Sequence, residues 1–152
     1  MGARKLVTLV LIAVAVVLTA RYLFWNDRRD VRRRLYAIAD AASGSGAELA
    51  TFVTDDVIIR TDAASFVGGR PAVVRLVHDA AAAHKQMRMS LDDVQVELID
   101  AATATAFFTL NISSDGASAP GTAPRQVHAT LIKRQGEWLL TRGEVLRTLE
   151  GR

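Results

Sequence analysis

The stretch Met87–Leu98 reads MRMSLDDVQVEL, and its apolar residues follow two alternating patterns of opposite parity. They occupy odd positions up to Leu91 and even positions from Val94 onward. Successive side chains of a strand point to opposite faces, so both sets share one face only if the strand bulges or bends between them. The slip falls at Asp92 and Asp93, where an extra residue would produce a β-bulge. We therefore predict a curved strand and a bent sheet.

The residues that follow predict a meander of antiparallel strands. Residues 103–112 alternate between apolar and polar side chains, with the even-numbered residues as the expected buried set. Residues 126–134 and 138–146 flank Gln135-Gly136, which is typical of a tight hairpin turn. The segment 113–124 is rich in small and polar residues and is expected to be a loop.

The residues before the curved strand predict helices, with one strand among them. In chain order we expect a helix capped by Asp27 or Asp30 with an apolar face over 31–42, a short helix over 47–53, a strand over 57–61 and a third helix beginning at 68–71. Helices grouped ahead of a strand meander indicate the α+β class rather than a doubly wound sheet.

The N-terminal segment Leu6–Trp25 reads LVTLVLIAVAVVLTARYLFW and predicts a transmembrane helix. Twenty helical residues rise about 30 Å, the thickness of the hydrocarbon core of a bilayer. The single charge, Arg21, lies near one end, where its side chain reaches the headgroups. Aromatic residues at the same end are typical of an interface. The expected membrane-interface residues are Arg21, Tyr22, Trp25, Arg28 and Arg29.

Two other interpretations of this segment are weaker. A cleaved signal peptide would also have basic residues ahead of an apolar core, but cleavage after Ala20 would place Leu18 where a small residue is preferred. A buried helix of a soluble domain would carry a polar face, and none interrupts the run. We therefore divide the chain into an anchor at 1–26, a basic juxtamembrane segment at 27–34 and one domain at 30–150.

Charge and composition exclude several classes of function. The net charge is +3, but residues 1–34 carry eight basic and two acidic side chains, which leaves residues 35–152 acidic. A basic segment beside an anchor attracts anionic headgroups, so we expect a membrane partner and no nucleic acid. The positive-inside rule places the domain on the cytoplasmic side. Without cysteine, and with three scattered histidines, we expect neither a metal site nor a cofactor.

Three short motifs resemble the nuclear transport factor 2-like superfamily. They are Leu49–Val57 (LATFVTDDV), Gly69-Arg70 at the start of a helix, and Gly136–Trp138 (GEW) in the last hairpin. The superfamily includes ketosteroid isomerase, SnoaL-like polyketide cyclases and many bacterial proteins. The resemblance covers residues 30–148 and implies a cone: three helices packed on a strongly bent, mostly antiparallel sheet that encloses a pocket.

The resemblance carries over only part of a catalytic site. Isomerase-like members use an Asp at the end of the first strand as a base, with a Tyr of the first helix and a second acid forming an oxyanion hole. Asp62 lies near the base position, although Thr61 fits the spacing equally well. Tyr36 lies on the first helix, beside the arginines. The strand at 103–112 has no acid, so this constellation is incomplete.

Four further residues are candidates for a ligand pocket, each with a structural alternative. His128 is the best single candidate for a polar group in the pocket, and His84 continues the apolar face of the third helix or caps its end. Arg142 and Glu144 are expected on the same face of the last strand as Trp138, where they line a cavity mouth or form an ion pair. For Asp62, a role as a turn residue is the favoured interpretation.

These observations predict a single-pass membrane protein with a non-catalytic domain that binds a small apolar ligand or a protein partner. A homodimer through the sheet is also implied by the resemblance. The alternative is an isomerase, cyclase or dehydratase that acts on a hydrophobic substrate in the cone pocket. A pure scaffold at the membrane would instead show an apolar patch on the outer face of the sheet.

Overall fold

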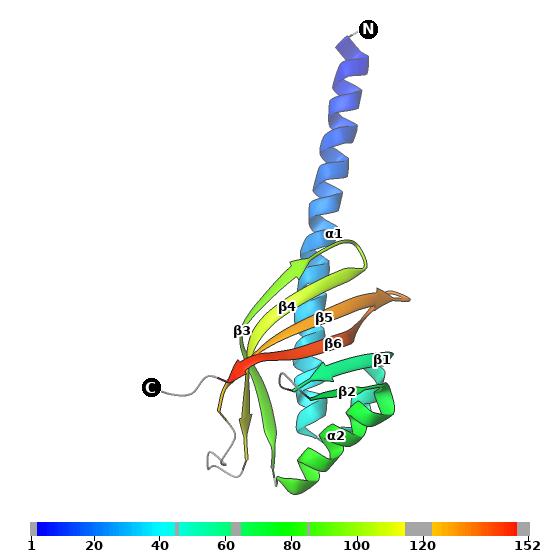
Figure 1. Ribbon diagram of the computed structural model, residues 1–152. Coiled ribbons are helices and arrows are strands. Elements are labelled where there is room, and N and C mark those ends of the chain that lie inside the picture. The colour runs from blue at the N-terminus through cyan, green and yellow to red at the C-terminus, as the bar shows by residue number, and fades with distance from the viewer. Residues whose placement is uncertain (1–2, 45, 62–64, 85, 115–122, 149–152) are drawn as a thin grey trace.

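The computed structural model describes residues 3–44, 46–61, 65–84, 86–114 and 123–148. It contains two α-helices, one short 3₁₀-helix and six strands (Figure 1). The elements are α1 (Ala3–Ser43), η1 (Ala47–Thr51), β1 (Val53–Arg60), β2 (Phe66–Gly68), α2 (Arg70–Ala83), β3 (Arg88–Leu98), β4 (Thr103–Ser113), β5 (Arg125–Arg134) and β6 (Glu137–Thr148). The expected α+β class is confirmed.

The helix α1 runs without a break for 41 residues, or about 60 Å. Its N-terminal half stands clear of the sheet, and its C-terminal half packs inside it (Figure 1). The expected helix start at Asp27 or Asp30 is therefore wrong. The Asp27 carboxylate instead accepts a hydrogen bond from Lys133 Nζ at 2.8 Å, which joins α1 to the sheet. From the sequence alone, an aspartate inside a long helix cannot be distinguished from an aspartate that caps the start of a helix. The contact with Lys133 identifies Asp27 as the first kind.

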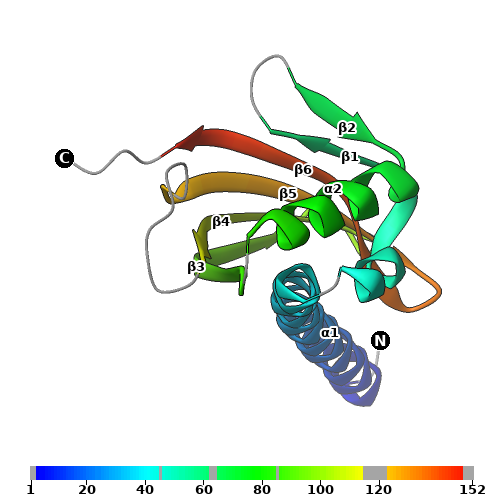
Figure 2. The same cartoon turned by 90° about the horizontal axis from the view of Figure 1, so that it is seen from below.

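The sheet is bent and has the order β2-β1-β6-β5-β4-β3. All neighbouring strands are antiparallel except β1 and β6. Figure 2 shows the sheet curving over α1 and α2, with both helices on its concave side. The predicted cone of helices under a strongly bent, mostly antiparallel sheet is therefore confirmed. The short strand β2 was not expected, and it extends the sheet beyond β1.

The predicted bulge in β3 is confirmed. The register of β3 against β4 shifts between Asp92 and Gln95, and Asp93 has a φ of 55°. The guanidinium of Arg32 donates a hydrogen bond to the Val94 carbonyl oxygen at 3.2 Å, so α1 contacts the strand at this bend. The predicted hairpin turn is confirmed as well, since Gln135-Gly136 joins β5 to β6.

In the basic triplet Arg32–Arg34, the first two side chains are exposed and that of Arg34 is half-buried. The side chain of Arg34 is 21% exposed, lies 3.8 Å from the Glu137 carboxylate and covers the ring of Phe52 at 5.1 Å. These contacts hold α1 against η1 and the β5–β6 hairpin. Arg28 and Arg29 are exposed.

The core lies between the C-terminal half of α1 and the concave face of the sheet. Val31, Leu35, Ala39 and Ala42 lie three or four residues apart on α1 and are all buried. At the end of the helix, the Ser43 hydroxyl accepts a hydrogen bond from the Met89 N–H at 2.7 Å. The core therefore continues to the end of α1, where the helix is joined to β3.

Candidate functional site

A cavity of about 180 Å³ lies between α1, α2 and the concave face of the sheet. Both helices and the middle strands contribute to it, because their buried faces meet around this space. Apart from Arg60 and Glu144, its lining residues are apolar or glycine, and they include Leu35, Ala39, Ala42, Val73, Leu91 and Ala129. Leu76 on α2 is 39% exposed, so the cavity reaches the surface beside this helix.

The two ionisable residues of the lining lie on neighbouring strands. Arg60 Nη1 is 3.6 Å from Glu144 Oε1, and their side chains are 43% and 31% exposed. This ion pair is partly solvated, so each charge has both a partner and water. The rest of the described lining is apolar, so the interior of the cavity suits an apolar molecule.

Gly143 lies between the ion pair and the core, where β6 passes close to β1. A Cβ atom at this position would lie 2.9 Å from Cδ1 of Ile59, closer than carbon atoms approach in proteins. The absence of a side chain thus lets Ile59 pack across the strand, and both residues line the cavity.

Three of the sequence candidates lie away from the cavity or outside the described residues. Tyr36 is 42% exposed and does not line the cavity. The side chain of His84 is exposed at the C-terminal end of α2. Its backbone N–H donates to the Ala80 carbonyl oxygen at 3.1 Å, so His84 is the C-cap residue of the helix. Asp62 lies outside the described residues, and neighbouring Thr61 is absent from the lining.

His128 lies on the convex face of the sheet and not in the cavity. Its ring stacks on Phe107 with centroids 4.4 Å apart and an interplanar angle of 18°. The strand pairing places it opposite Glu144. The prediction that His128 lies in the pocket rested on its alternation with Thr130 and Ile132, but alternation alone does not tell which face of the sheet is concave.

A second bulge corrects the expected placement of Arg142 and Glu144. The register of β5 against β6 shifts by one residue at Thr141, so Trp138 and Leu140 face the core and Arg142 is exposed on the other face. Glu144 lies two residues beyond Arg142 and opposite His128, so its side chain shares their face, while the residue borders the cavity at its ion pair with Arg60. The expected ion pair therefore forms, but with a residue on β1.

Arg70 was not among our candidates, although its motif was noted. At the start of α2, its guanidinium donates to the Val53 carbonyl oxygen at 3.0 Å and lies 2.8 Å from the Asp55 carboxylate. These contacts fix α2 to β1, beside the cavity that Val53 lines. The motifs LATFVTDDV and Gly69-Arg70 therefore meet in the structure, and their role is to hold α2 in place.

The convex face carries a broad groove of about 660 Å³, to which β3 to β6 contribute. Its apolar residues include Phe107 and Leu146, which are 46% and 50% exposed. Within the part of the chain that the structure describes, no group of three or more His, Cys, Asp or Glu side chains is placed to hold a metal ion.

The N-terminal half of α1 is long and apolar enough to cross a membrane. Its most apolar window has a mean hydropathy of 2.3, and none of that window is buried. Tyr22 and Trp25, at the expected interface, are 66% and 65% exposed. Apolar side chains that contact no other part of the chain are consistent with a lipid environment.

Comparisons with known proteins agree on one fold. A family model described as a SnoaL-like domain matches residues 14–143. An NTF2-like protein with a cystatin-like fold from Novosphingobium aromaticivorans is 20% identical, with a TM-score of 0.74, and the match covers 89% of this chain and 90% of that one. No curated protein matches the chain.

Two further similar structures are of candidate dehydratases. A candidate scytalone dehydratase from Novosphingobium aromaticivorans is 15% identical, with a TM-score of 0.73, over 86% of this chain and 89% of that one. A candidate dehydratase of the NTF2-like family from Streptomyces avermitilis is 19% identical, with a TM-score of 0.67, over 82% and 99%. At these identities the similarity establishes the fold alone.

Proposed function

Because the chain belongs to the SnoaL-like domain family, we propose that it is a membrane-anchored protein that binds a small apolar ligand without transforming it. The membership agrees with the nuclear transport factor 2-like resemblance of its motifs. The observation that carries the proposal is the cavity, whose interior surface is almost entirely carbon. An apolar cavity of about 150 Å³ is known to stay dry and to bind benzene. The cavity here, at about 180 Å³, suits an apolar molecule of about one ring.

Benzene is the simplest probe of this proposal. A ligand that binds only the folded state raises the free energy of unfolding, by about 2.7 kcal/mol at one hundred times its Kd. We expect benzene to raise the Tm of the full chain in detergent, and Ala42→Leu to abolish this rise by filling the cavity. Ala42 lines the cavity, whereas its neighbour Ala41 does not. Ala41→Leu should therefore keep the benzene response.

Native mass spectrometry of the purified full chain then identifies the natural ligand. A retained apolar molecule that is lost in Ala42→Leu but kept in Ala41→Leu supports the proposal. A benzene response that is unchanged in Ala42→Leu contradicts it, because binding would then occur elsewhere.

An enzyme of the dehydratase, isomerase or cyclase type is the second candidate. It is favoured by the two candidate dehydratases among the similar structures and by the ion pair of Arg60 and Glu144, two residues that border the cavity. The native mass spectra distinguish the two functions, since an enzyme would convert the captured molecule on incubation. In that case Glu144→Gln should slow the conversion.

We also propose that the protein forms a homodimer through the convex face of the sheet. Phe107 and Leu146 are exposed apolar residues of its groove, which favours a protein contact. We expect Phe107→Glu to convert the dimer into a monomer, because it would bury a charge in the interface. Multi-angle light scattering of the full chain in detergent measures the mass. Phe66→Glu, at an exposed residue of β2, is the matched control, and a monomeric unchanged protein would contradict the proposal.

The membrane part of the proposal rests on the exposed apolar half of α1. We place the domain on the cytoplasmic side, because Arg28, Arg29 and the basic triplet follow the span while Arg4 and Lys5 precede it. Protease digestion of sealed inside-out vesicles tests this side, and a protected domain would place it on the other one.

A further inference from the structure

The turn between β3 and β4, residues 99–102, is held beside α1 by a chain of polar contacts. The Lys133 N–H donates to the Ala102 carbonyl oxygen at 2.7 Å. The Nζ atom of the same lysine lies 2.8 Å from Asp27 Oδ1, and the Asp27 side chain is 15% exposed. The position of the turn along α1 is therefore set at Asp27.

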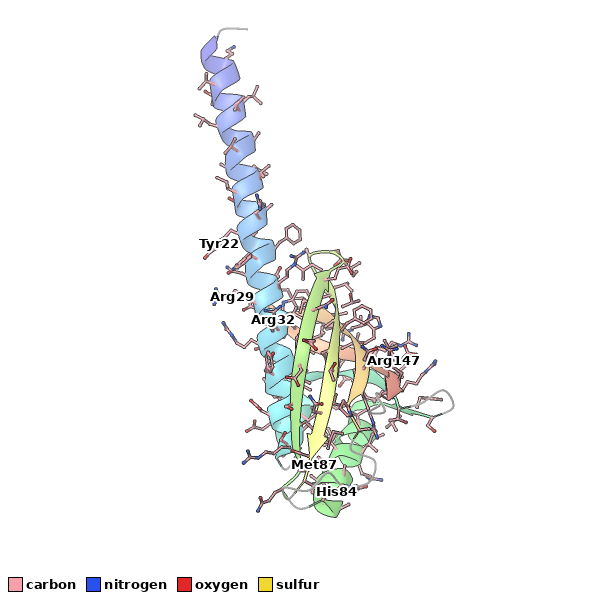
Figure 3. The ribbon with its side chains drawn as sticks, turned by 90° about the vertical axis from the view of Figure 1, so that its left-hand side faces the viewer. Tyr22, Arg29, Arg32, His84, Met87 and Arg147 are labelled. Atoms are coloured by element: carbon pink, nitrogen blue, oxygen red, sulfur yellow. The ribbon has the colours of Figure 1, made fainter. Side chains whose placement is uncertain are left out.

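Asp27 lies close to the expected membrane interface. It follows Trp25 by two residues, or about 3 Å along the helix. The headgroup layer extends about 5–7 Å beyond the hydrocarbon core on each side of a bilayer. In Figure 3 the β3–β4 turn is the end of the sheet nearest the N-terminal half of α1 and lies at the level of the helix between Tyr22 and Arg29. With Trp25 at the expected interface, this geometry would place the turn at headgroup depth.

The chemistry of the turn suits this depth. Ile99 is 58% exposed at its start, and the Asp100 carboxylate accepts a hydrogen bond from the Ala102 N–H at 2.7 Å. The Asp100 carboxylate is therefore partly satisfied by a hydrogen bond within the turn, while the Ile99 side chain is exposed to the surroundings. Arg28 and Arg29 on α1 are exposed near the same level and attract anionic headgroups. A single exposed isoleucine is ordinary elsewhere, but here it lies beside the expected interface.

We propose that the β3–β4 turn is a second membrane contact, in which Ile99 enters the headgroup layer and seats the domain on the bilayer in one orientation. This inference rests on the proposed anchoring by α1. It also sets the route of the ligand. The cavity lining on α1 begins at Leu35, about 15 Å beyond Trp25 along the helix, and the cavity reaches the surface at Leu76 of α2. The ligand then enters from the aqueous side and not from the bilayer.

Single-cysteine labelling tests the seating, because the chain has no cysteine of its own. Full-length Ile99→Cys, Tyr22→Cys and His84→Cys proteins are labelled with an environment-sensitive fluorophore and reconstituted in vesicles of phosphatidylcholine and phosphatidylglycerol. His84 lies at the end of the domain farthest from the N-terminal half of α1 (Figure 3). We expect blue-shifted emission and quenching by nitroxide lipids at positions 22 and 99, and neither effect at 84.

The outcomes separate the two proposals. Quenching at 22 without quenching at 99 overturns the seating and leaves the anchor intact, and a protein partner for Ile99 would then be the alternative. Absence of quenching at 22 overturns the anchor itself. Phe66→Cys is the matched control, because Phe66 is an apolar residue on β2 with 68% exposure. Quenching at 66 equal to that at 99 overturns the single orientation.

Discussion

Leu131→Ala is expected to lower the free energy of unfolding of the domain by about 2–5 kcal/mol, the range for a leucine truncated in a packed core. Leu131 is 0% exposed and lies on β5, in the middle of the sheet, where it pairs with Ala104 of β4 and Leu140 of β6. Because strands hold it on both sides, the neighbouring backbone cannot move in to fill the space. The removed carbon atoms therefore leave most of their volume empty.

Urea denaturation of the full chain in lipid nanodiscs, followed by near-ultraviolet circular dichroism, measures this loss. Ile132→Ala is the matched control, because Ile132 is the next residue of β5, points to the other face and is only half-buried. Ile132→Ala should lower the free energy of unfolding clearly less than Leu131→Ala does. Equal losses in the two variants would mean that the concave face is not the main core.

Replacing Val14 and Val17 together by aspartate is expected to release the protein from membranes. Both residues lie in the middle of the apolar half of α1 and are 49% and 57% exposed. An aspartate at the centre of a spanning helix costs roughly 2.5–3.5 kcal/mol, so the pair costs about twice that. Since the C-terminal half of α1 packs in the core and the acids lie outside it, the domain should still fold.

Membrane retention after alkaline carbonate extraction checks this expectation. The matched control carries leucine at both positions and should stay in the membrane fraction. Circular dichroism of the released aspartate variant should show the folded sheet. An aspartate variant that resists extraction as well as the leucine control would contradict a transmembrane role for this half of α1.

The bulges in β3 and at Thr141 show how far the sequence could predict the sheet. The bulge in β3 was predictable, because apolar residues with clear parity lie on both sides of Asp92 and Asp93. The bulge at Thr141 was missed, because the first core-facing position after it is Gly143. Glycine has no side chain, so it does not show that the core-facing residues have changed from even to odd positions. One undetected extra residue was enough to place Arg142 on the wrong face.

The sequence predicted apolar residues that line the candidate site, but it did not predict where the polar and charged side chains lie. The apolar face of α1 between Leu35 and Ala42 was predicted from its spacing, and in the structure it forms one side of the cavity. His128 was misplaced because alternation leaves the choice of face to the rest of the sheet. The contacts of Arg34 and Arg70 depend on segments distant in the chain, so no local pattern could show them.

The unbroken course of α1 means that the domain cannot rotate independently of the N-terminal half of this helix. An α-helix advances by 1.5 Å and turns by about 100° for each residue. One residue inserted between Trp25 and Val31 would therefore rotate the whole sheet by about 100° around the helix axis, relative to the N-terminal half of α1. An insertion of four residues would bring the sheet back to within about 40° of its present orientation. The number of residues between Trp25 and Val31 thus determines the orientation of the cavity about the axis of α1, relative to any neighbour that packs along this helix.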